Sequence, residues 1–224
     1  MIKIYEELDQ GSDAWFAARC GLLTASEMKL VITPTGKVAV NDKATAHLHE
    51  IVAQRITKYV EPHYIGDDQM RGWEDEIRAR EKYIEHYAPV KEVGFITNDK
   101  WGFTLGYSPD GLVGNEGLIE CKSRRQKFQI ESIVKDAMPD EYYIQVQTGL
   151  LVTERLWCDF ISYSAGLPMM VKRVWSDGEM QNQIIEAAAI FESKAKDMIK
   201  EYKKLCKKYK YLPTEREVEQ EIEI

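Results

Sequence analysis

Residues 90–122 alternate β-rich segments with turns, and this alternation constrains the possible folds more than any other feature of the sequence. The segments read VKEVGFIT, WGFTLGYS and GLIECKS, and Asn-Asp-Lys and Pro-Asp-Gly separate them. Short strands that alternate with turn residues are typical of antiparallel sheets. We therefore expect an antiparallel meander in this region, with helices flanking it.

Helical spacing precedes and follows this region. Apolar residues recur every three or four positions in four segments, at 44–59, 73–87, 142–151 and 184–209. Asn41 or Asp42 is expected to cap the first of these helices. Thr24 to Glu27 has the S/T-x-x-E spacing of a capping box, which predicts a further helix that starts near Thr24.

The remaining segments complete an α+β pattern. Strands are expected at Ile2–Tyr5, 155–164 and 169–175, and a short helix at 12–19. The predicted fold is a single domain with a central mixed, largely antiparallel sheet flanked by helices, and it ends in a long C-terminal helix. We expect this domain to occupy residues 1–212 and an acidic tail to follow at 213–224.

Composition excludes several classes of protein. The chain is 44% hydrophobic and 30% charged, as soluble globular proteins are, and it has no apolar run long enough to span a membrane. We therefore expect a cytoplasmic protein with no membrane partner. The cysteines are far apart and form no CxxC pair, which argues against disulfides and cysteine-bound metals; they are Cys20, Cys121, Cys158 and Cys206. The net charge of −7 argues against a nucleic-acid binder that uses its whole surface, but it leaves room for a local basic groove.

Two carboxylates and an amine are expected to meet on one hairpin. Asp110 follows Ser-Pro, Glu120 and Lys122 flank Cys121, and a Gly-Asn-Glu-Gly turn lies midway between the two motifs. A loop centred on Asn115 sets Asp110 opposite Glu120, with Cβ atoms about 5 Å apart. The period of two then places Lys122 on the same face and turns the Cys121 side chain into the core. Each motif alone has an ordinary structural interpretation, as a type I turn and as a charged strand.

This arrangement predicts a metal site. Two carboxylates this close repel each other unless a cation lies between them, and hard oxygen ligands suit Mg²⁺ or Mn²⁺. The backbone carbonyl of Cys121 is a candidate third ligand. Such an ion beside a lysine can hydrolyse a phosphodiester, with Lys122 orienting water and stabilising charge. Between two acids Lys122 should stay protonated, so it would be a poor general base.

These motifs resemble a known family. Asp110, nine intervening residues and then Glu120-x-Lys122 match the PD-(D/E)xK nuclease pattern, and SPDGL resembles its form in the phage lambda exonuclease family of viral recombination nucleases. The likeness extends in order from about Gly11 to Val152. The other matching motifs are Trp15 with Arg19 and Gly21, residues 24–27, Gly72 with Glu76, and Gln145-Val146-Gln147. The resemblance implies a fold like that of restriction endonucleases.

The resemblance also implies roles for individual residues. Glu76 would be a metal-site or water-orienting acid, although its spacing also allows a surface salt bridge with Arg80. Gln145 would contact water or phosphate at the metal. The residues expected to hold the terminal 5′-phosphate of DNA, or to lie beside it, are Arg19, Ser26, Ser108 and Tyr142. For Ser26 the predicted helix start offers an independent reason, because helix N-termini favour anions.

A basic run follows the predicted catalytic strand. Lys122, Arg124, Arg125 and Lys127 place four positive charges within six residues. The run is either a solvated patch or a source of phosphate contacts. Which of Arg124, Arg125 or Lys127 replaces the family's phosphate-binding arginine stays open at this point. The family's arginine at the DNA entrance has no clear counterpart in residues 33–40.

The function implied by the resemblance is specific. It is a 5′–3′ exonuclease that acts on linear double-stranded DNA with two Mg²⁺ or Mn²⁺ ions and leaves a 3′ single strand for annealing recombination. The family forms ring-shaped homotrimers and works with a single-strand annealing protein, in phage-infected or lysogenic bacteria. Two alternatives stay open, a PD-(D/E)xK endonuclease and a catalytically inactive module that binds DNA ends or protein.

Overall fold

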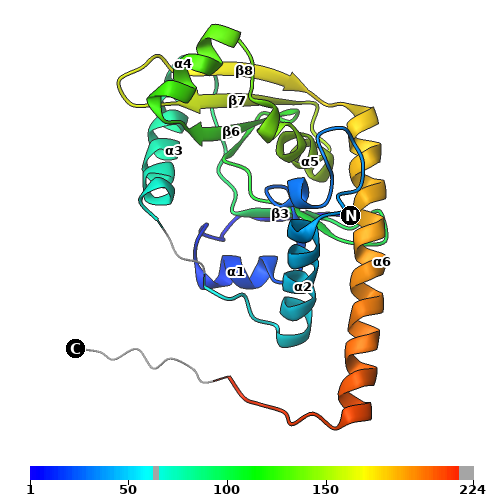
Figure 1. Ribbon diagram of the computed structural model, residues 1–224. Coiled ribbons are helices and arrows are strands. Elements are labelled where there is room, and N and C mark those ends of the chain that lie inside the picture. Colours follow the sequence, from blue (N-terminus) through cyan, green and yellow to red (C-terminus); the bar gives the residue numbers. More distant parts are fainter. Residues whose placement is uncertain (63–65, 217–224) are drawn as a thin grey trace, which may run out of the picture.

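The computed structural model describes residues 1–62 and 66–216, with only the backbone of 67–69 (Figure 1). Its elements, in chain order, are β1 (Ile2–Tyr5), α1 (Asp13–Arg19), β2 (Leu23–Thr24), η1 (Met28–Leu30), α2 (Asp42–Thr57), α3 (Asp67–His86), β3 (Phe95–Asn98), β4 (Leu105–Tyr107), β5 (Gly111–Val113), β6 (Gly117–Ser123), α4 (Gln126–Lys135), η2 (Asp140–Tyr142), α5 (Tyr143–Thr153), β7 (Trp157–Tyr163), β8 (Met170–Trp175) and α6 (Gly178–Tyr209). The predicted α+β class and the long C-terminal helix are confirmed. Residues 217–224 lie outside the described part, so the predicted domain boundary near 213 stays a prediction.

The described strands form two sheets of mixed direction. The orders are β1-β3-β4-β2 and β5-β6-β7-β8. Each sheet has one parallel pair, β2 with β4 and β6 with β7, and its other pairs are antiparallel. Helix α5 contacts β3 and β4 of the first sheet and β7 of the second. It therefore ties the two sheets together.

The expectation of one meander across residues 90–122 was wrong. Strand β4 pairs with β2 and β3, whereas β5 pairs with β6 in the other sheet. The chain passes between the sheets at Ser108, Pro109 and Asp110, where the proline has no N–H to donate to a strand ladder. The crossing is held by Gln10, whose side-chain amide donates to the Pro109 carbonyl at 3.2 Å.

The helix predicted to start near Thr24 is also absent from this segment. The backbone N–H of Ala25 donates to the Gly106 carbonyl at 2.9 Å, so the extended pairing of β2 with β4 continues past Thr24. The Thr24 hydroxyl donates to the Glu27 carboxylate at 2.6 Å instead of capping a helix. Only the three residues of η1 follow, as a 3₁₀ turn. Pairing with a distant strand thus overrides the local capping signal.

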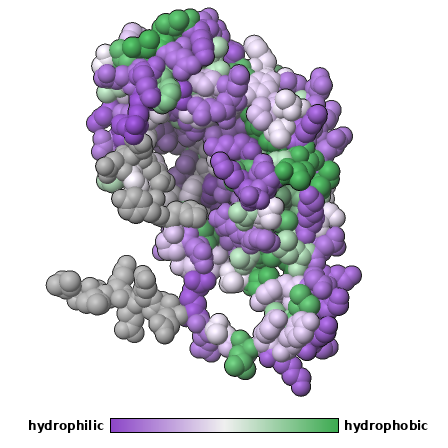
Figure 2. Space-filling model, in the orientation of Figure 1, coloured by the Kyte–Doolittle hydropathy of each residue, from purple (hydrophilic) through white to green (hydrophobic). Residues whose placement is uncertain are grey.

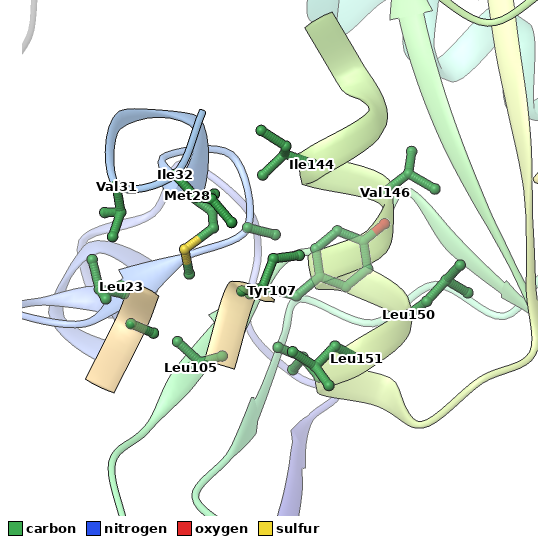
Figure 3. Packing of buried hydrophobic residues seen from close by; sticks show 14 of the residues in the cluster. Leu23, Met28, Val31, Ile32, Leu105, Tyr107, Ile144, Val146, Leu150 and Leu151 are labelled. Atoms are coloured by element: carbon green, nitrogen blue, oxygen red, sulfur yellow. The ribbon is translucent and has the colours of Figure 1, made fainter. Parts of the chain in front are cut away.

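Tyr107 lies at the centre of the larger hydrophobic core. Figure 3 shows its ring between the residues around η1, such as Met28 and Ile32, and the side chains of α5, such as Leu150. Gly149 allows this approach, because a Cβ there would lie 2.8 Å from Cζ of the ring. The end of β4 is therefore fixed firmly against α5.

Helix α3 buries a different face from the predicted one. Trp73, Ile77 and Ile84 were expected to form its buried stripe, but they are half-exposed. The buried face contains Asp75 and Tyr83. The Asp75 carboxylate accepts a hydrogen bond of 2.6 Å from the Ser123 hydroxyl, and the Tyr83 hydroxyl donates one of 2.6 Å to the Asp159 carboxylate. Polar anchors on the second sheet thus decide how α3 is oriented.

Two helices expose apolar residues. In α6 the predicted stripe is buried up to Ala195, and beyond it Tyr202 is exposed where the helix extends past the rest of the fold (Figure 1). Helix α4 turns Gln129 inward and exposes Ile130 and Val134. Figure 2 shows the resulting hydrophobic surface over α4 at the top of the molecule. Within the described residues, no helix combines the length and the apolarity needed to cross a membrane.

Candidate active site

The hairpin of β5 and β6 has the predicted register. Its paired residues are Gly111 with Ile119, Leu112 with Leu118, and Val113 with Gly117. One further step of this pairing places Asp110 opposite Glu120. The Asp110 carboxylate accepts a hydrogen bond from the backbone N–H of Cys121 at 2.5 Å. The Cys121 side chain lies in the smaller hydrophobic core on the other face, as predicted.

The two carboxylates are buried together. Asp110 is 9% exposed and Glu120 is 1% exposed. Burial raises the pKa of Asp110 well above its usual range, and the nearby Glu120 charge raises it further. A buried pair of this kind is stable as two anions only when cations or hydrogen-bond donors surround it.

Glu120 is surrounded by three side-chain donors. The Tyr107 hydroxyl donates to Oε2 at 2.7 Å, and the Lys122 ammonium and the Gln145 amide approach Oε1 at 2.6 and 2.5 Å. Burial lowers the pKa of Lys122, but the charges of Glu120 and Asp110 outweigh it and raise the pKa above its usual value. Lys122 is therefore a permanent cation, as the sequence predicted.

The predicted phosphate-binding residues converge beside the acids. Arg19 donates to the Ser108 hydroxyl at 3.2 Å and to the Thr24 hydroxyl at 3.3 Å. Its guanidinium lies 4.1 Å from the centre of the Trp15 ring, and the Trp15 indole N–H donates to Ser108 at 3.0 Å. Burial lowers the pKa of Arg19, and the Glu27 charge opposes that effect. This cation is held in place by a rigid aromatic and two hydroxyls.

One pocket of about 170 Å³ joins these groups. The predicted site residues that line it are Arg19, Ser26, Ser108, Asp110, Glu120, Lys122 and Gln145. They come from β6, α5, the end of α1, the crossing at 108–110 and the loop after β2. Ser26 reaches the pocket from this loop, so the helix N-terminus expected to favour an anion there is not the reason for its position.

Glu76 forms the salt bridge that its spacing allowed, and its role at a metal site stays a prediction. Its carboxylate pairs with Arg80 at 3.0 Å, and Arg80 also donates to the backbone carbonyl of Asp110 at 3.3 Å. Burial raises the pKa of Glu76, and the Glu120 charge adds to this effect. Glu76 therefore lies within electrostatic reach of the acid pair while it holds a salt bridge.

The basic run 122–127 does not enter the pocket as a group. Among its described residues only Lys122 lines the pocket. Arg124 is buried, with bonds of 2.8 Å to the Glu141 carboxylate and the Tyr142 hydroxyl. Arg125 and Lys127 are exposed at the start of α4. The Tyr142 ring lies 5.5 Å from the Lys122 ammonium, so Arg124 reaches the site only through Tyr142.

Comparison with known proteins identifies the family. Residues 14–156, more than half of the chain, match the model of the YqaJ-like viral recombinase domain. The chain belongs to this family. The chain is similar to an alkaline exonuclease, LHK-Exo from Laribacter hongkongensis, with 33% identity and a TM-score of 0.73 over 87% of this chain and 100% of that one. LHK-Exo in complex with dAMP matches over the same shares, with 34% identity and the same TM-score of 0.73.

A third match shows the fold alone. The phage-related exonuclease from Haemophilus somnus 129PT is 13% identical, with a TM-score of 0.58 over 81% of this chain and 96% of that one. No curated protein matches the chain. The resemblance to viral recombination nucleases inferred from the motifs is confirmed, and the family supports a nuclease function for this recombinase.

Three residues of the recombinase site were not assigned roles from the sequence. Tyr107 donates to Glu120, Gln10 holds the crossing at Pro109, and Trp15 stacks on Arg19. Trp15 belongs to a matched motif, which was the only signal for it. Tyr107 lies in an apolar strand and has the pattern of a core residue. The neighbouring sequence therefore gives no sign that its hydroxyl contacts the acid pair.

The acid pair of the recombinase fits a divalent ion. In the described part of the chain, no three His, Cys, Asp or Glu side chains converge as a metal-binding group. The two acids that the hairpin brings together are Asp110 and Glu120, and Glu76 lies apart from them in its salt bridge with Arg80. Both are hard oxygen donors, and two buried like charges are stabilised by a cation between them. The donor chemistry suits Mg²⁺ or Mn²⁺.

Proposed function

We propose that this recombinase is a metal-dependent 5′–3′ exonuclease. It hydrolyses one strand of linear double-stranded DNA from a 5′ end and leaves a 3′ single strand for annealing recombination. The observation that supports this most is the shared pocket, in which Asp110, Glu120 and Lys122 lie beside Arg19 and the two serines. Hydrolytic groups and anion-binding groups in one small pocket suit an enzyme that recognises a terminal phosphate and cleaves next to it.

Each side chain has a defined task in this reaction. Asp110, Glu120 and the Cys121 carbonyl would hold Mg²⁺ or Mn²⁺, and Glu76, whose charge acts on Asp110, would be the further acid of a two-ion site. When bound, a divalent ion neutralises charge on the scissile phosphate and makes water a stronger nucleophile. Protonated Lys122 stabilises the negative charge that builds up on the phosphate, and it is a poor proton acceptor. Gln145 orients water or phosphate through its amide.

The terminal phosphate would be held by Arg19, Ser26 and Ser108. Arg19 keeps its planar guanidinium fixed on Trp15, a geometry that suits phosphate oxygens. Tyr142 lies beside Lys122, and the buried Arg124 would act on the site through Tyr142. The exposed Arg125 and Lys127 would contact DNA only farther along the duplex. The structure of a relative with dAMP supports a mononucleotide as product.

The assembly is part of the proposal. A ring-shaped homotrimer around the DNA would let an acidic chain hold DNA with a few inward-facing cations. The exposed apolar residues of α4 and of the outer half of α6 support contacts with other subunits. A single-strand annealing protein is the expected partner for the 3′ strand.

Degradation of a labelled duplex tests the proposal. With Mg²⁺, the wild type should shorten a 5′-phosphorylated linear duplex and spare a closed circle. Asp110→Ala and Lys122→Ala should each lose activity by about 10²-fold or more, because each removes a charge from the reacting centre. Glu131→Ala, on the exposed face of α4, is the matched control and should keep full activity.

Three results would contradict the proposal in different ways. Cleavage of the closed circle would make the chain an endonuclease. Full activity of both site variants would show that the reaction takes place at another site. Tight binding of DNA ends by a wild type that degrades none of them would make it a binding module.

A further inference from the structure

Two cavities extend from the active-site pocket. The first, of about 240 Å³, shares Gln10, Trp15 and Arg19 with the pocket. The second, of about 500 Å³, shares Phe16 and Trp73 with the first. The two cavities therefore adjoin each other and the active-site pocket, and they form a hollow lined from α1 and α3.

Flat aromatic groups line this hollow along its length. The Arg19 guanidinium stacks on Trp15, and the Trp15 ring meets the Phe16 ring edge to face at a centroid distance of 4.9 Å. Trp73 lines both cavities from the α3 side. Phe16 is 39% exposed and Trp73 is 48% exposed, so part of each ring is open to a ligand in the hollow.

Charge around the larger cavity does not favour a phosphate. Among its described lining residues, the charged ones are Asp13, Glu61 and Lys58. Arg216 stacks 3.6 Å from the centre of the Tyr59 ring and so occupies one face of that aromatic. With its charges nearly balanced and its walls mostly apolar, the cavity suits a flat uncharged group.

We infer that Trp73 and Phe16 receive the unpaired nucleobase of the 5′-terminal nucleotide. This inference rests on the proposed exonuclease function. If Arg19 holds the terminal phosphate and the acid pair holds the next one, the nucleoside between them must project its base out of a pocket of only about 170 Å³. A cavity of about 440 Å³ also adjoins the pocket, but it is lined by Glu76, Arg80 and Asp110, whose charges suit a base less well. The aromatic hollow is the adjoining space with flat walls. Stacking there offsets the cost of taking the base out of the duplex.

A photochemical cross-link locates the base directly. The probe is a 5′-phosphorylated duplex with 5-iododeoxyuridine at its 5′-terminal position, bound to the full chain in EDTA so that it is not degraded. We expect the cross-linked peptide to contain Trp73 or Phe16. The same label five nucleotides into the duplex should not reach these peptides. A terminal label that cross-links to other peptides only, or to none, would overturn the assignment.

Kinetics on an abasic end measure what the base contributes. The wild type should degrade a normal 5′ end about 5- to 150-fold more efficiently, in kcat/KM, than an end whose terminal nucleotide lacks its base. Trp73→Ala should abolish most of this preference, and Trp73→Phe should keep most of it. Trp175→Ala, which removes an exposed tryptophan of β8, should behave as the wild type.

The outcomes separate the two proposals. A wild type that degrades normal and abasic ends equally well refutes the base-binding cavity and leaves the exonuclease intact. A preference that persists in Trp73→Ala also refutes it. A wild type that degrades neither substrate refutes the exonuclease itself.

Discussion

The ion pair between Arg55 of α2 and Glu192 of α6 provides a sharp test of how the fold is held together. The two guanidinium nitrogens lie 2.7 and 2.6 Å from the two carboxylate oxygens. The Glu192 side chain is 7% exposed and that of Arg55 is 20% exposed. The third donor of Arg55, Nε, bonds to the Gly21 carbonyl at 2.8 Å, just before the loop that contains Ser26. The pair therefore joins two helices to the segment that leads into the proposed phosphate-binding residues.

Glu192→Gln keeps the shape of this contact and removes only its negative charge. Breaking a buried ion pair from one side costs about 3–5 kcal/mol, because the other charge is left buried without a counter-charge. A fifth of the Arg55 side chain still reaches water, so we expect the lower end, about 3 kcal/mol. For a chain of this length, that loss corresponds to a fall in Tm of about 6–12 °C.

Urea denaturation and thermal melts of matched variants measure the effect. Glu201→Gln breaks the exposed pair with Lys204 and should cost at most about 1 kcal/mol. The double variant Arg55→Met with Glu192→Leu should be more stable than Glu192→Gln, since it leaves no charge unpaired. The reasoning is refuted if Glu192→Gln lies within about 1 kcal/mol of the wild type, or if the double variant is no more stable than the single one.

Three further predictions concern α6, the core and the acid pair. Asp177→Ala removes the N-cap of α6 and should cost about 1 kcal/mol in the free energy of unfolding. The Tyr143 hydroxyl and two backbone N–H groups lower the pKa of Asp177 in the folded protein. The Asp177 charge therefore contributes fully to stability above about pH 4, and this contribution is lost as the pH falls through the lowered pKa of the folded state. In an acid titration, the free energies of unfolding of the wild type and Asp177→Ala should converge in that range. Gly149→Ala drives a Cβ to within 2.8 Å of the buried Tyr107 ring and should cost about 1–3 kcal/mol in urea denaturation. Asp110→Asn should abolish degradation and yet raise Tm in EDTA, because burial and the neighbouring carboxylate disfavour the charge that it removes; an unchanged or lower Tm would count against this.

The sequence predicted the structure correctly where a feature depends on local residues alone. A turn with glycines at both ends centres the hairpin on Asn115, and the period of two then sets Asp110 against Glu120. The cap predicted at Asn41 is likewise local, and its side chain accepts the Ala44 N–H at 2.9 Å. Features of this kind depend on residues only a few positions apart, so they can be predicted from the sequence without knowing the tertiary contacts.

The features that could not be predicted depend on distant partners. Thr24 and Glu27 have the spacing of a capping box, but pairing of β2 with β4 keeps the backbone extended there. Trp73 has helical apolar spacing, but α3 is oriented by the polar anchors of Asp75 and Tyr83 on the second sheet. Helical spacing predicts that a helix forms, and only the tertiary contacts decide which of its faces is buried.

The division into two sheets has a consequence for the proposed chemistry. Ser108 lies at the end of β4 in the first sheet, and Asp110 lies at the start of β5 in the second. Only Pro109 separates them, and the Tyr107 hydroxyl bonds across the same boundary to Glu120. The covalent link and this hydrogen bond fix the residues proposed to bind the terminal phosphate relative to the acid pair. Arg80 of α3 also donates a hydrogen bond to the Asp110 carbonyl. The proposed cleavage at a fixed distance from a 5′ end requires this distance to be constant, and the covalent link and the hydrogen bond are two independent constraints that keep it so.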